Sequence, residues 1–494
     1  MTIASIRNGE ARTRWGALAL IVVAQFMVIL DVAIVNVALP SIKSDLHFSE
    51  ENLQWVITAY AILFGGALLL GGRLADLLGR RRLFVAGVSV FTISSLLSGF
   101  AWSESSLIGF RAVQGFGGAL LAPAALSILM TTFQEGRDRN LALGIWGAAS
   151  GSGGAAGVLL GGVLTSYLHW SWIFFINVPV GVAVVALTPF LLDEGRRLVE
   201  HRRFDVAGAT SVTAGLMLLV YAMTRATQDG WGSSTTIGLL LAAAALMASF
   251  VAIELRSRAP LLPMRIFRLR SLAAANAAGV AIAAVGFSMF FLLTLYLQQV
   301  LHYSAIQTGL AFVAITLTII VFSNVAQTLV TRFGARRILT TGLLTAAAAL
   351  GWLTQLPANG HYFWDVFPAL ILGGVGMAFS FISMTIAGLT GVEQGDAGVA
   401  SGLINTSRQI GGAIGLAAVS TIAATTSSSY RDAHPGTPSL EAAALTHGFE
   451  ISFYVLVALA LVGAAIAAVF VEARPRPKAE PVQEAMFAEI EEAA

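Results

Sequence analysis

A succession of long apolar runs, separated by short polar breaks, constrains this chain more than any other feature of its sequence. At about 1.5 Å of rise per residue, a helix of about 20 apolar residues crosses the hydrocarbon core of a bilayer. Hydrophobic residues make up 56% of the 494 and charged residues only 11%, against roughly 25% in an ordinary soluble domain. The sequence therefore predicts an all-α integral membrane protein.

Fourteen of the runs are long enough to be transmembrane helices. Their approximate limits are 15–39, 53–72, 83–101, 105–131, 140–166, 172–192, 206–224, 236–255, 271–300, 306–331, 338–356, 365–388, 397–425 and 449–471. The first run follows three arginines, as a signal peptide would, but it is too long and lacks a small-residue cleavage site. We therefore interpret it as a retained first span. The longest extracellular loop is expected at 425–448.

The basic residues are sorted between alternate breaks. Cytoplasmic loops of membrane proteins are enriched in Lys and Arg. If the N-terminus is inside, all but five of the 29 Lys and Arg residues fall in inner segments. Three of the five lie outside, Lys43, Arg225 and Arg431, and the other two, Arg111 and Arg408, fall within spans. The pattern predicts fourteen spans with both termini cytoplasmic.

The chain also repeats itself. LLGRRRLFVAG (77–87) follows the second span and RFGARRILTTG (332–342) follows the tenth, with Gly79 aligned to Gly334. Many transporters build two halves around a midplane site from such repeats. The predicted organisation is an N-terminal cytoplasmic tail (1–14), an N-terminal six-helix bundle (15–192), two inserted helices with basic cytoplasmic loops (193–270), a C-terminal six-helix bundle (271–471) and a disordered cytoplasmic tail (472–494).

Asp31 lies alone near the middle of the first apolar run. A carboxylate there costs roughly 2.5–3.5 kcal/mol on insertion scales. The cost falls if the group takes a proton or finds a cationic partner. Asp31 is therefore a candidate proton-binding switch.

Arg111 is the natural partner for this acid. It shares a face of the fourth span with Gly115 and Gly118, with Gln114 close by. Arg111 and Asp31 both lie in the outer halves of antiparallel spans, and the glycines permit close approach. We predict that Arg111 approaches Asp31 or its hydrogen-bonded neighbours, so that protonation of Asp31 would free Arg111. The alternative is a static buried pair that only fixes helix register.

The segment GGRLADLLGRRR (71–82) is the most specific motif. An acid at the inner end of a span can pair with arginines and accept hydrogen bonds from a helix N-terminus. Such a cluster can latch two bundles in one conformation and release them in another. The alternative is that the arginines only hold the loop inside. The second copy carries Thr331 in place of the acid, which makes the latch lopsided. We name as the loop latch Gly72, Asp76, Gly79, Arg80 and Arg81.

Polar residues inside spans are candidates for a substrate cavity. Gln25 and Asn36 lie close to one direction of the first span, and Asp31 points more than about 100° away. The thirteenth span carries a polar stripe that includes Arg408, and cavity lining and interhelical hydrogen bonding are its two interpretations. Phe and Met residues of 287–299 and 377–384 could form an adaptable apolar pocket, or else face lipid or core. The cavity candidates are Gln25, Asn36, Tyr60, Gln114, Asn405, Arg408 and Gln409.

Several kinds of site are excluded. The chain has no cysteine, so disulfides and thiolate metal sites are absent, and its seven histidines lack the paired spacing of a metal site. GSGGAAG (151–157) lies inside an apolar span without the preceding strand of a dinucleotide loop. No phosphate loop with its lysine exists, and the basic residues form short clusters rather than one nucleic-acid-binding stripe. We expect no enzymatic activity, metal, cofactor, nucleotide or nucleic acid.

Motifs along nearly the whole chain resemble the fourteen-span drug:proton antiporter branch of the major facilitator superfamily. Besides 71–82 they are LDVAIVNVALP (30–40), WVITAY (55–60), RAVQGFGGA (111–119), WIFFINVPVG (172–181) and SGLINTSRQIGGAIG (401–415). The fifth-span glycine motif is partly broken, because Val158 stands where the family usually places proline. The glycines that it keeps are Gly153, Gly157, Gly161 and Gly162.

The resemblance implies a proton-coupled exporter of amphipathic or cationic small molecules that works by alternating access about a midplane cavity. The expected partners are the substrate, protons and the lipid bilayer, and we expect a monomer in a bacterial cell membrane. One alternative is a narrow exporter of a single metabolite, such as a self-made antibiotic. Another is a membrane scaffold or receptor that has a transporter fold but moves nothing.

Overall fold

The computed structural model describes residues 3–48, 50–53, 55–134, 136–192, 205–257, 260–435 and 440–472. All regular secondary structure in these ranges is helical. Thirteen helical segments within them are long and apolar enough to cross a membrane. A further helix, α14 (Ala335–Leu353), lies where the eleventh span is predicted. The end of the predicted C-terminal tail, from residue 473, lies outside the described residues.

The helices fall into three groups along the chain. The first group comprises α1 (Ile3–Asp45), α2 (Glu50–Leu53), α3 (Trp55–Leu78), α4 (Arg80–Gly99), α5 (Glu104–Thr132), α6 (Arg137–Tyr167), α7 (Trp172–Phe175) and α8 (Asn177–Leu191). The inserted pair is α9 (Val206–Asp229) and α10 (Ser234–Arg256). The last group comprises η1 (Met264–Arg268), α11 (Arg270–Leu295), η2 (Tyr296–Val300), α12 (Ala305–Ala311), α13 (Val313–Phe333), α14, η3 (Tyr362–Val366), α15 (Phe367–Leu389), η4 (Gln394–Asp396), α16 (Ala397–Ala433) and α17 (Leu440–Phe470).

Helices extend into two segments outside the predicted spans. The predicted tail 1–14 continues α1 back to Ile3. The predicted extracellular loop 425–448 is wrong over most of its length, since α16 runs to Ala433 and α17 begins at Leu440. Polar side chains there form hydrogen bonds to the helix backbone and do not end the helix. The Ser429 hydroxyl donates to the Thr425 carbonyl one turn back (3.0 Å). Polarity alone was a poor guide to the helix end.

The internal repeat marks two equivalent joints. Gly79 ends α3 and precedes α4, and Gly334 ends α13 and precedes α14. Both glycines have positive φ, 102° and 87°, which residues with a Cβ rarely adopt. We call the end of the molecule where these two joints and the α5–α6 joint lie the arginine-rich end.

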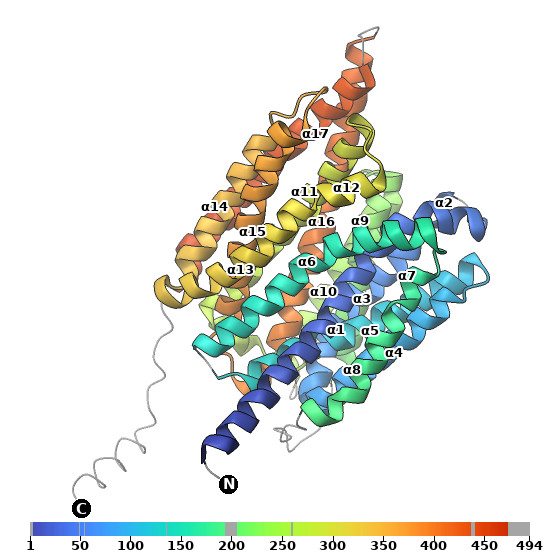
Figure 1. The fold of residues 1–494 in the computed structure, drawn as a ribbon. Helices are drawn as coiled ribbons and strands as arrows, with labels where there is room; N and C mark the ends of the chain where they lie inside the picture. Colours follow the sequence, from blue (N-terminus) through green and yellow to red (C-terminus); the bar gives the residue numbers. More distant parts are fainter. Residues whose placement is uncertain are drawn as a thin grey trace, which may run out of the picture.

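The first and last groups form two bundles that meet along two seams. In one seam α6 lies beside α12 and α13, and in the other α3 lies beside α16 (Figure 1). Small residues allow close contact at both. A Cβ on Gly72 of α3 would collide with the Gly398 carbonyl of α16, and a Cβ on Gly151 of α6 would collide with Ile319 of α13. Small residues are how helices approach each other where lipid supplies no hydrophobic driving force.

The inserted pair lies against the α3–α16 seam. α9 packs on both α3 and α16. A Cβ on Gly66 of α3 would collide with Met217 of α9. The turn between α9 and α10 is tied to α16 through the Trp231 indole, which donates to the Thr421 hydroxyl (2.9 Å).

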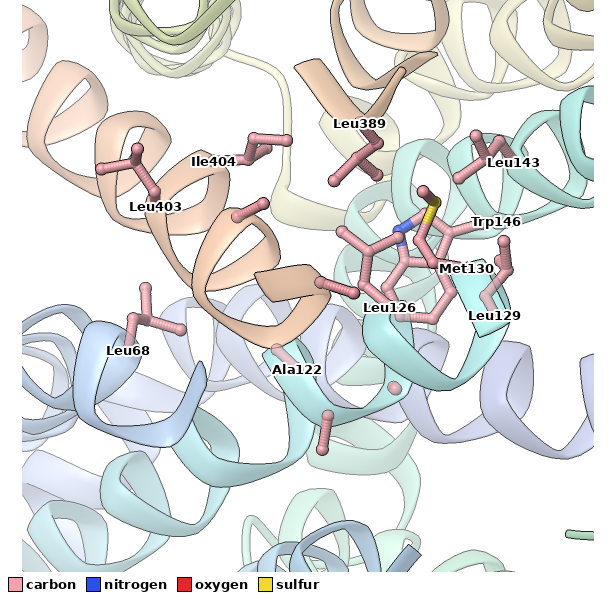
Figure 2. Packing of buried hydrophobic residues seen from close by; sticks show 14 of the residues in the cluster. Leu68, Ala122, Leu126, Leu129, Met130, Leu143, Trp146, Leu389, Leu403 and Ile404 are labelled. Carbon is pink, nitrogen blue, oxygen red and sulfur yellow. The ribbon is translucent and has the colours of Figure 1, made fainter. Parts of the chain in front are cut away.

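An apolar layer joins the two bundles near the arginine-rich end. Its side chains come from both bundles and share one buried cluster (Figure 2). The layer consists of Leu68 of α3, Ala122, Leu126, Leu129 and Met130 of α5, Leu143 and Trp146 of α6, Leu389 of α15, and Leu403 and Ile404 of α16. The two bundles are therefore closed against each other at this end.

Replacing Gly157 by leucine is expected to lower the melting temperature in detergent by several degrees. A Cβ at Gly157 would lie 2.7 Å from the Ala33 Cβ of α1, and overpacking of this kind costs about 1–3 kcal/mol. Gly154, three residues earlier on α6, has nothing within 4 Å of its Cβ position. Gly154→Leu is therefore the matched control and should melt like the wild type or slightly higher. Equal losses in the two variants would contradict the close α1–α6 contact.

Candidate functional site

A buried ion pair lies between α1 and α5. The side chain of Asp31 is 0% exposed and that of Arg111 is 1% exposed. Arg111 Nη1 lies 2.6 Å from Asp31 Oδ2, so the approach predicted from the sequence is present. The other carboxylate oxygen, Oδ1, accepts from Gln114 Nε2 (2.8 Å) and from Asn177 Nδ2 (2.9 Å). The carboxylate thus accepts three hydrogen bonds from charged or amide donors.

The guanidinium of Arg111 is held on several sides. Nη1 also donates to Gln114 Oε1 (2.8 Å), and Nε donates to the Val56 carbonyl of α3 (3.2 Å). The guanidinium carbon lies 4.3 Å from the centre of the Tyr60 ring, a cation–π arrangement. Gly115 lies directly against the Tyr60 carbonyl, so glycine on α5 is what allows this approach. Helices α1, α3, α5 and α8 all contribute to the site.

Sequence reasoning missed Asn177. This residue begins α8, is 1% exposed, and bridges Asp31 to the Ser95 hydroxyl of α4 (3.1 Å). The Ser95 hydroxyl in turn donates to the Phe174 carbonyl (2.9 Å). A signal was available, because Asn177 is the only amide in the apolar run 172–192. The reason to look there was the same as for Asp31, since a polar group in a span needs a partner.

The loop latch connects the two bundles at the arginine-rich end. Asp76 Oδ1 accepts from the Gly398 N–H and Oδ2 from the Val399 N–H, both at 3.1 Å. These are the first free N–H groups of α16, where the helix dipole favours negative charge. Arg80 Nη2 lies 3.4 Å from Asp76 Oδ1. The side chain of Asp76 is only 1% exposed, so the charge is sealed inside the contact.

The remaining latch residues have different positions. Gly72 lies against the Gly398 carbonyl, which lets α3 approach the start of α16. Gly79 forms the turn into α4. Arg81 makes no ion pair with any residue that the structure describes.

The second joint carries a neutral contact in place of the charged one. Thr331 Oγ1 accepts from Asn140 Nδ2 of α6 (2.8 Å), which connects α13 of one bundle to α6 of the other. The two seams are therefore fastened differently, by a carboxylate at α3–α16 and by a neutral hydrogen bond between Asn140 and Thr331 at α6–α13.

The cavity candidates do not form one group. Tyr60 and Gln114 belong to the Asp31 network. Gln25 and Asn36 share a helix direction but not an environment. Gln25 is buried, and its Oε1 has no partner among the described residues. Asn36 is exposed and donates to the Val32 carbonyl (2.9 Å).

The other three candidates lie together on α16. Asn405 donates to the Ser401 carbonyl one turn back (2.9 Å). The Gln409 Cβ lies 3.7 Å from where a Cβ on Gly65 of α3 would be. The Arg408 guanidinium lies over the Phe381 ring of α15, 4.2 Å from its centre. The stripe thus faces two different neighbours, α3 and α15.

The fifth-span glycines divide between two partners. Gly153, Gly157 and Gly161 pack closely on Ile29, Ala33 and Ile34 of α1. Gly162 faces Ile306 of α12 in the other bundle (3.2 Å from its Cβ position). Val158 also faces that bundle, where it packs against Gly309 of α12. α6 is one helix from Arg137 to Tyr167 and packs between α1 and the second bundle.

Within the described ranges, no three His, Asp or Glu side chains are grouped closely enough to hold a metal ion.

Comparison with known proteins identifies the family. A family model described as Major Facilitator Superfamily matches residues 21–416. The chain belongs to the major facilitator superfamily. It is therefore a multi-pass membrane transporter, and the arrangement described above is the transporter fold of that superfamily.

Relatives within the superfamily carry names of antibiotic resistance or export. The puromycin resistance protein of Streptomyces alboniger is 37% identical over 471 residues, which cover 94% of this chain and 93% of the relative. The cephamycin export protein of Amycolatopsis lactamdurans is 40% identical, and the match covers 84% of this chain and 86% of the relative. The multidrug resistance protein Stp of Mycobacterium tuberculosis is 34% identical, and the match covers 83% of this chain and 76% of the relative.

A solved structure has the same fold. The human organic anion transporter MFSD10 superposes with a TM-score of 0.66, and the match covers 92% of this chain and 99% of that one. The two sequences are only 14% identical, so the likeness concerns the fold.

Replacing Arg111 by glutamine is expected to destabilise the transporter strongly, because it leaves the Asp31 carboxylate buried without its cation. Breaking one side of a buried pair costs about 3–5 kcal/mol. The double variant Asp31→Asn, Arg111→Gln removes both charges and should recover part of the loss in melting temperature. Arg265→Gln, which breaks an exposed pair with Asp396, is the control and should change stability by less than about 1 kcal/mol. An unchanged melting temperature for Arg111→Gln would contradict the network.

Replacing Asp76 by asparagine is expected to open the arginine-rich end more often. Hydrogen bonds to a charged acceptor contribute about 1.5–3 kcal/mol each, so the population of the open form should rise about tenfold or more. The chain has no cysteine, so Leu126→Cys in the apolar layer gives a single thiol whose maleimide labelling in detergent reports opening. Asp138→Asn, a change at an exposed acid on α6, is the matched control. Equal labelling rates in the two backgrounds would refute the latch contact as a stabiliser of the closed form.

Proposed function

We propose that this transporter is a proton-coupled antiporter that exports amphipathic small molecules. The observation that carries the proposal is the carboxylate of Asp31, fully buried and held by Arg111, Gln114 and Asn177. The names of relatives, which refer to resistance to or export of puromycin, cephamycin and multiple drugs, support the choice of cargo.

In this proposal Asp31 changes its protonation state as the bundles exchange exposure. Its ionised form fits the conformation described here, which is closed at the arginine-rich end. Protonation would remove the charge that holds Arg111, and Gln114 and Asn177 would lose an ionic acceptor. Because the whole network is buried, the proton can reach Asp31 only after the surrounding helices rearrange, which couples the proton to the motion.

The driving force comes from the membrane potential and the pH difference. A proton that enters from outside and leaves inside moves down a potential worth about 2.3 kcal/mol per 100 mV. The loop latch would stabilise the form closed on the inside and would break when the bundles rock. Close packing of α1 on the glycines of α6 would transmit the change at Asp31 to the seam with the second bundle.

The topology follows the same proposal. The arginine-rich end would face the cytoplasm of a bacterial cell, with fourteen spans, both termini inside, and the bundle limits given by the sequence. The transporter would act as a monomer without a cofactor. Gln25, Asn36, Asn405, Arg408 and Gln409 are the residues that we propose for contact with cargo.

A narrow exporter of a single antibiotic is the second candidate, because two of the relatives are named for one compound each. A susceptibility panel of dyes and antibiotics in a host lacking its own pumps separates the two. Resistance to one compound only would favour the narrow exporter, and resistance to chemically unrelated compounds would favour the broad one.

Replacing Asp31 by asparagine is expected to abolish gradient-driven transport. The variant should lose stability but still fold, because Arg111 keeps the Gln114 amide oxygen, the Val56 carbonyl and the Tyr60 ring as partners. In proteoliposomes, an imposed pH difference should drive uptake of at least one of puromycin, rhodamine 6G and fluorescein by the wild type, and the variant should lose about tenfold or more of this stimulation because no charge change remains. The exposed Asp432→Asn is the matched control. Full gradient-driven transport by Asp31→Asn would exclude Asp31 as the coupling residue. No flux in the wild type under any gradient would favour the scaffold alternative.

A further inference from the structure

Arg408 is a cation within the membrane-spanning helix α16, and no residue that the structure describes forms an ion pair with it. It lies eleven residues after Ala397, the first residue of α16, and hence roughly 16 Å along that helix. Among the residues that the structure describes, no carboxylate lies within ion-pair distance of it, and its guanidinium contacts the Phe381 ring instead. A guanidinium has five N–H donors. The face of an aromatic ring does not replace the oxygen acceptors that these donors need.

The two arginines within the spans have different surroundings. Arg111 has a carboxylate, an amide oxygen, a backbone carbonyl and a ring around it. For Arg408, the described part of the chain supplies only the Phe381 ring. A charge held in an apolar setting without compensation is expensive, so its presence in a span indicates a ligand rather than a structural role.

Within the described ranges, no buried acid is available to compensate Arg408. Of the acids with buried side chains in the described part of the chain, Asp31 is held by Arg111, and Asp76 is held by Arg80 and the start of α16. The third, Glu254 of α10, accepts from the backbone N–H groups of Leu261 and Leu262 (3.0 and 3.1 Å). Each buried carboxylate is thus committed elsewhere.

Arg408 lies where the bundles face each other. The ring on which it stacks, Phe381 of α15, lies 3.5 Å from where a Cβ on Gly147 of α6 would be. Its neighbour Gln409 faces Gly65 of α3. The side chain is therefore in the second bundle but beside the junction with the first, and it retains partial solvent exposure. Transporters place substrate at the midplane between their repeats.

We propose that Arg408 and Phe381 form a subsite for the negatively charged group of an amphipathic cargo, a carboxylate or sulfonate attached to an aromatic or apolar body. The fork of the guanidinium matches such a group, and the ring provides apolar surface for the adjoining body. The inference rests on the proposed export function and narrows its cargo to anions and zwitterions. Export of an anion against entry of a proton moves positive charge inward twice, so the membrane potential assists both movements.

Two dyes with the same xanthene body and opposite charge test the subsite. Fluorescein is an anion and rhodamine 6G is a cation, and binding of each to the purified transporter in detergent is followed by fluorescence anisotropy without any gradient. The wild type is expected to bind fluorescein more tightly than rhodamine 6G. Arg408→Gln should weaken fluorescein binding about tenfold or more, since hydrogen bonds to a charged donor are lost, and should not weaken rhodamine 6G binding. Arg408→Lys should recover part of the fluorescein affinity.

A matched control is available in the same chain. Arg332 also stacks on a phenylalanine, Phe333, at 5.2 Å, but it is exposed at the arginine-rich end. Arg332→Gln should change the affinity for neither dye. The melting temperature of Arg408→Gln should not fall, because removing an uncompensated charge from an apolar setting does not destabilise the fold.

Three outcomes would overturn the subsite. In the first, the wild type binds fluorescein no more tightly than rhodamine 6G. In the second, Arg408→Gln weakens the binding of both dyes equally. In the third, Arg408→Gln has a lower melting temperature but an unchanged preference between the dyes. Because binding is measured without a gradient, failure of the export function leaves a different signature. A protein that binds fluorescein through Arg408 but moves no cargo under a pH difference would refute export and retain the subsite.

Discussion

The structure depends on how a few charges are compensated inside an apolar bundle. Asp31 and Arg111 lie 2.6 Å apart with essentially no exposure, and the amides of Gln114 on α5 and Asn177 on α8 complete the arrangement. Taking two charges out of water is costly, and only good geometry and additional hydrogen bonds offset the cost. The positions of α1, α3, α5 and α8 relative to one another are therefore fixed by this network as well as by packing.

The contacts between the bundles are of two kinds. Along the seams, glycines allow backbones to meet, as at Gly72 and Gly398, and these contacts are tight but individually weak. At the arginine-rich end the fastening is polar and unequal. Asp76 contributes a carboxylate at the start of α16, whereas Thr331 contributes one neutral hydrogen bond to α6. An interface of many small contacts plus one ionic contact can have two stable arrangements, which continuous apolar packing would not favour.

Much of this could be predicted from the sequence, because the cost of charge in a membrane is local and large. This cost singled out Asp31, Arg111, Asp76 and Arg408. For Asp31 and Arg111, the opposite directions of their spans also indicated contact. The partner of Asp76 could not be predicted. The sequence indicated a helix N-terminus, but nothing showed that it would be that of α16, more than 300 residues away along the chain.

Other features could not be predicted for identifiable reasons. Asn177 is neutral, so its cost in a span is smaller and it attracted no attention, although its amide spans Asp31 and Ser95. The segment 425–448 was expected to be a loop because it is polar, yet the helix extends through its first part with hydroxyls bonded to the preceding turn. The common direction of Gln25 and Asn36 was a matter of helix geometry, but their burial depends on neighbours that only the fold supplies.

The inserted helices have a mechanical consequence. Because α9 is in close contact with α3 at Gly66 and also packs on α16, it bridges the two sides of one seam. If the bundles separate there, α9 can remain with only one of them, and the tighter contact is with α3. The hydrogen bond between Trp231 and Thr421 must then break, so the inserted hairpin can bias the energy of one arrangement over the other.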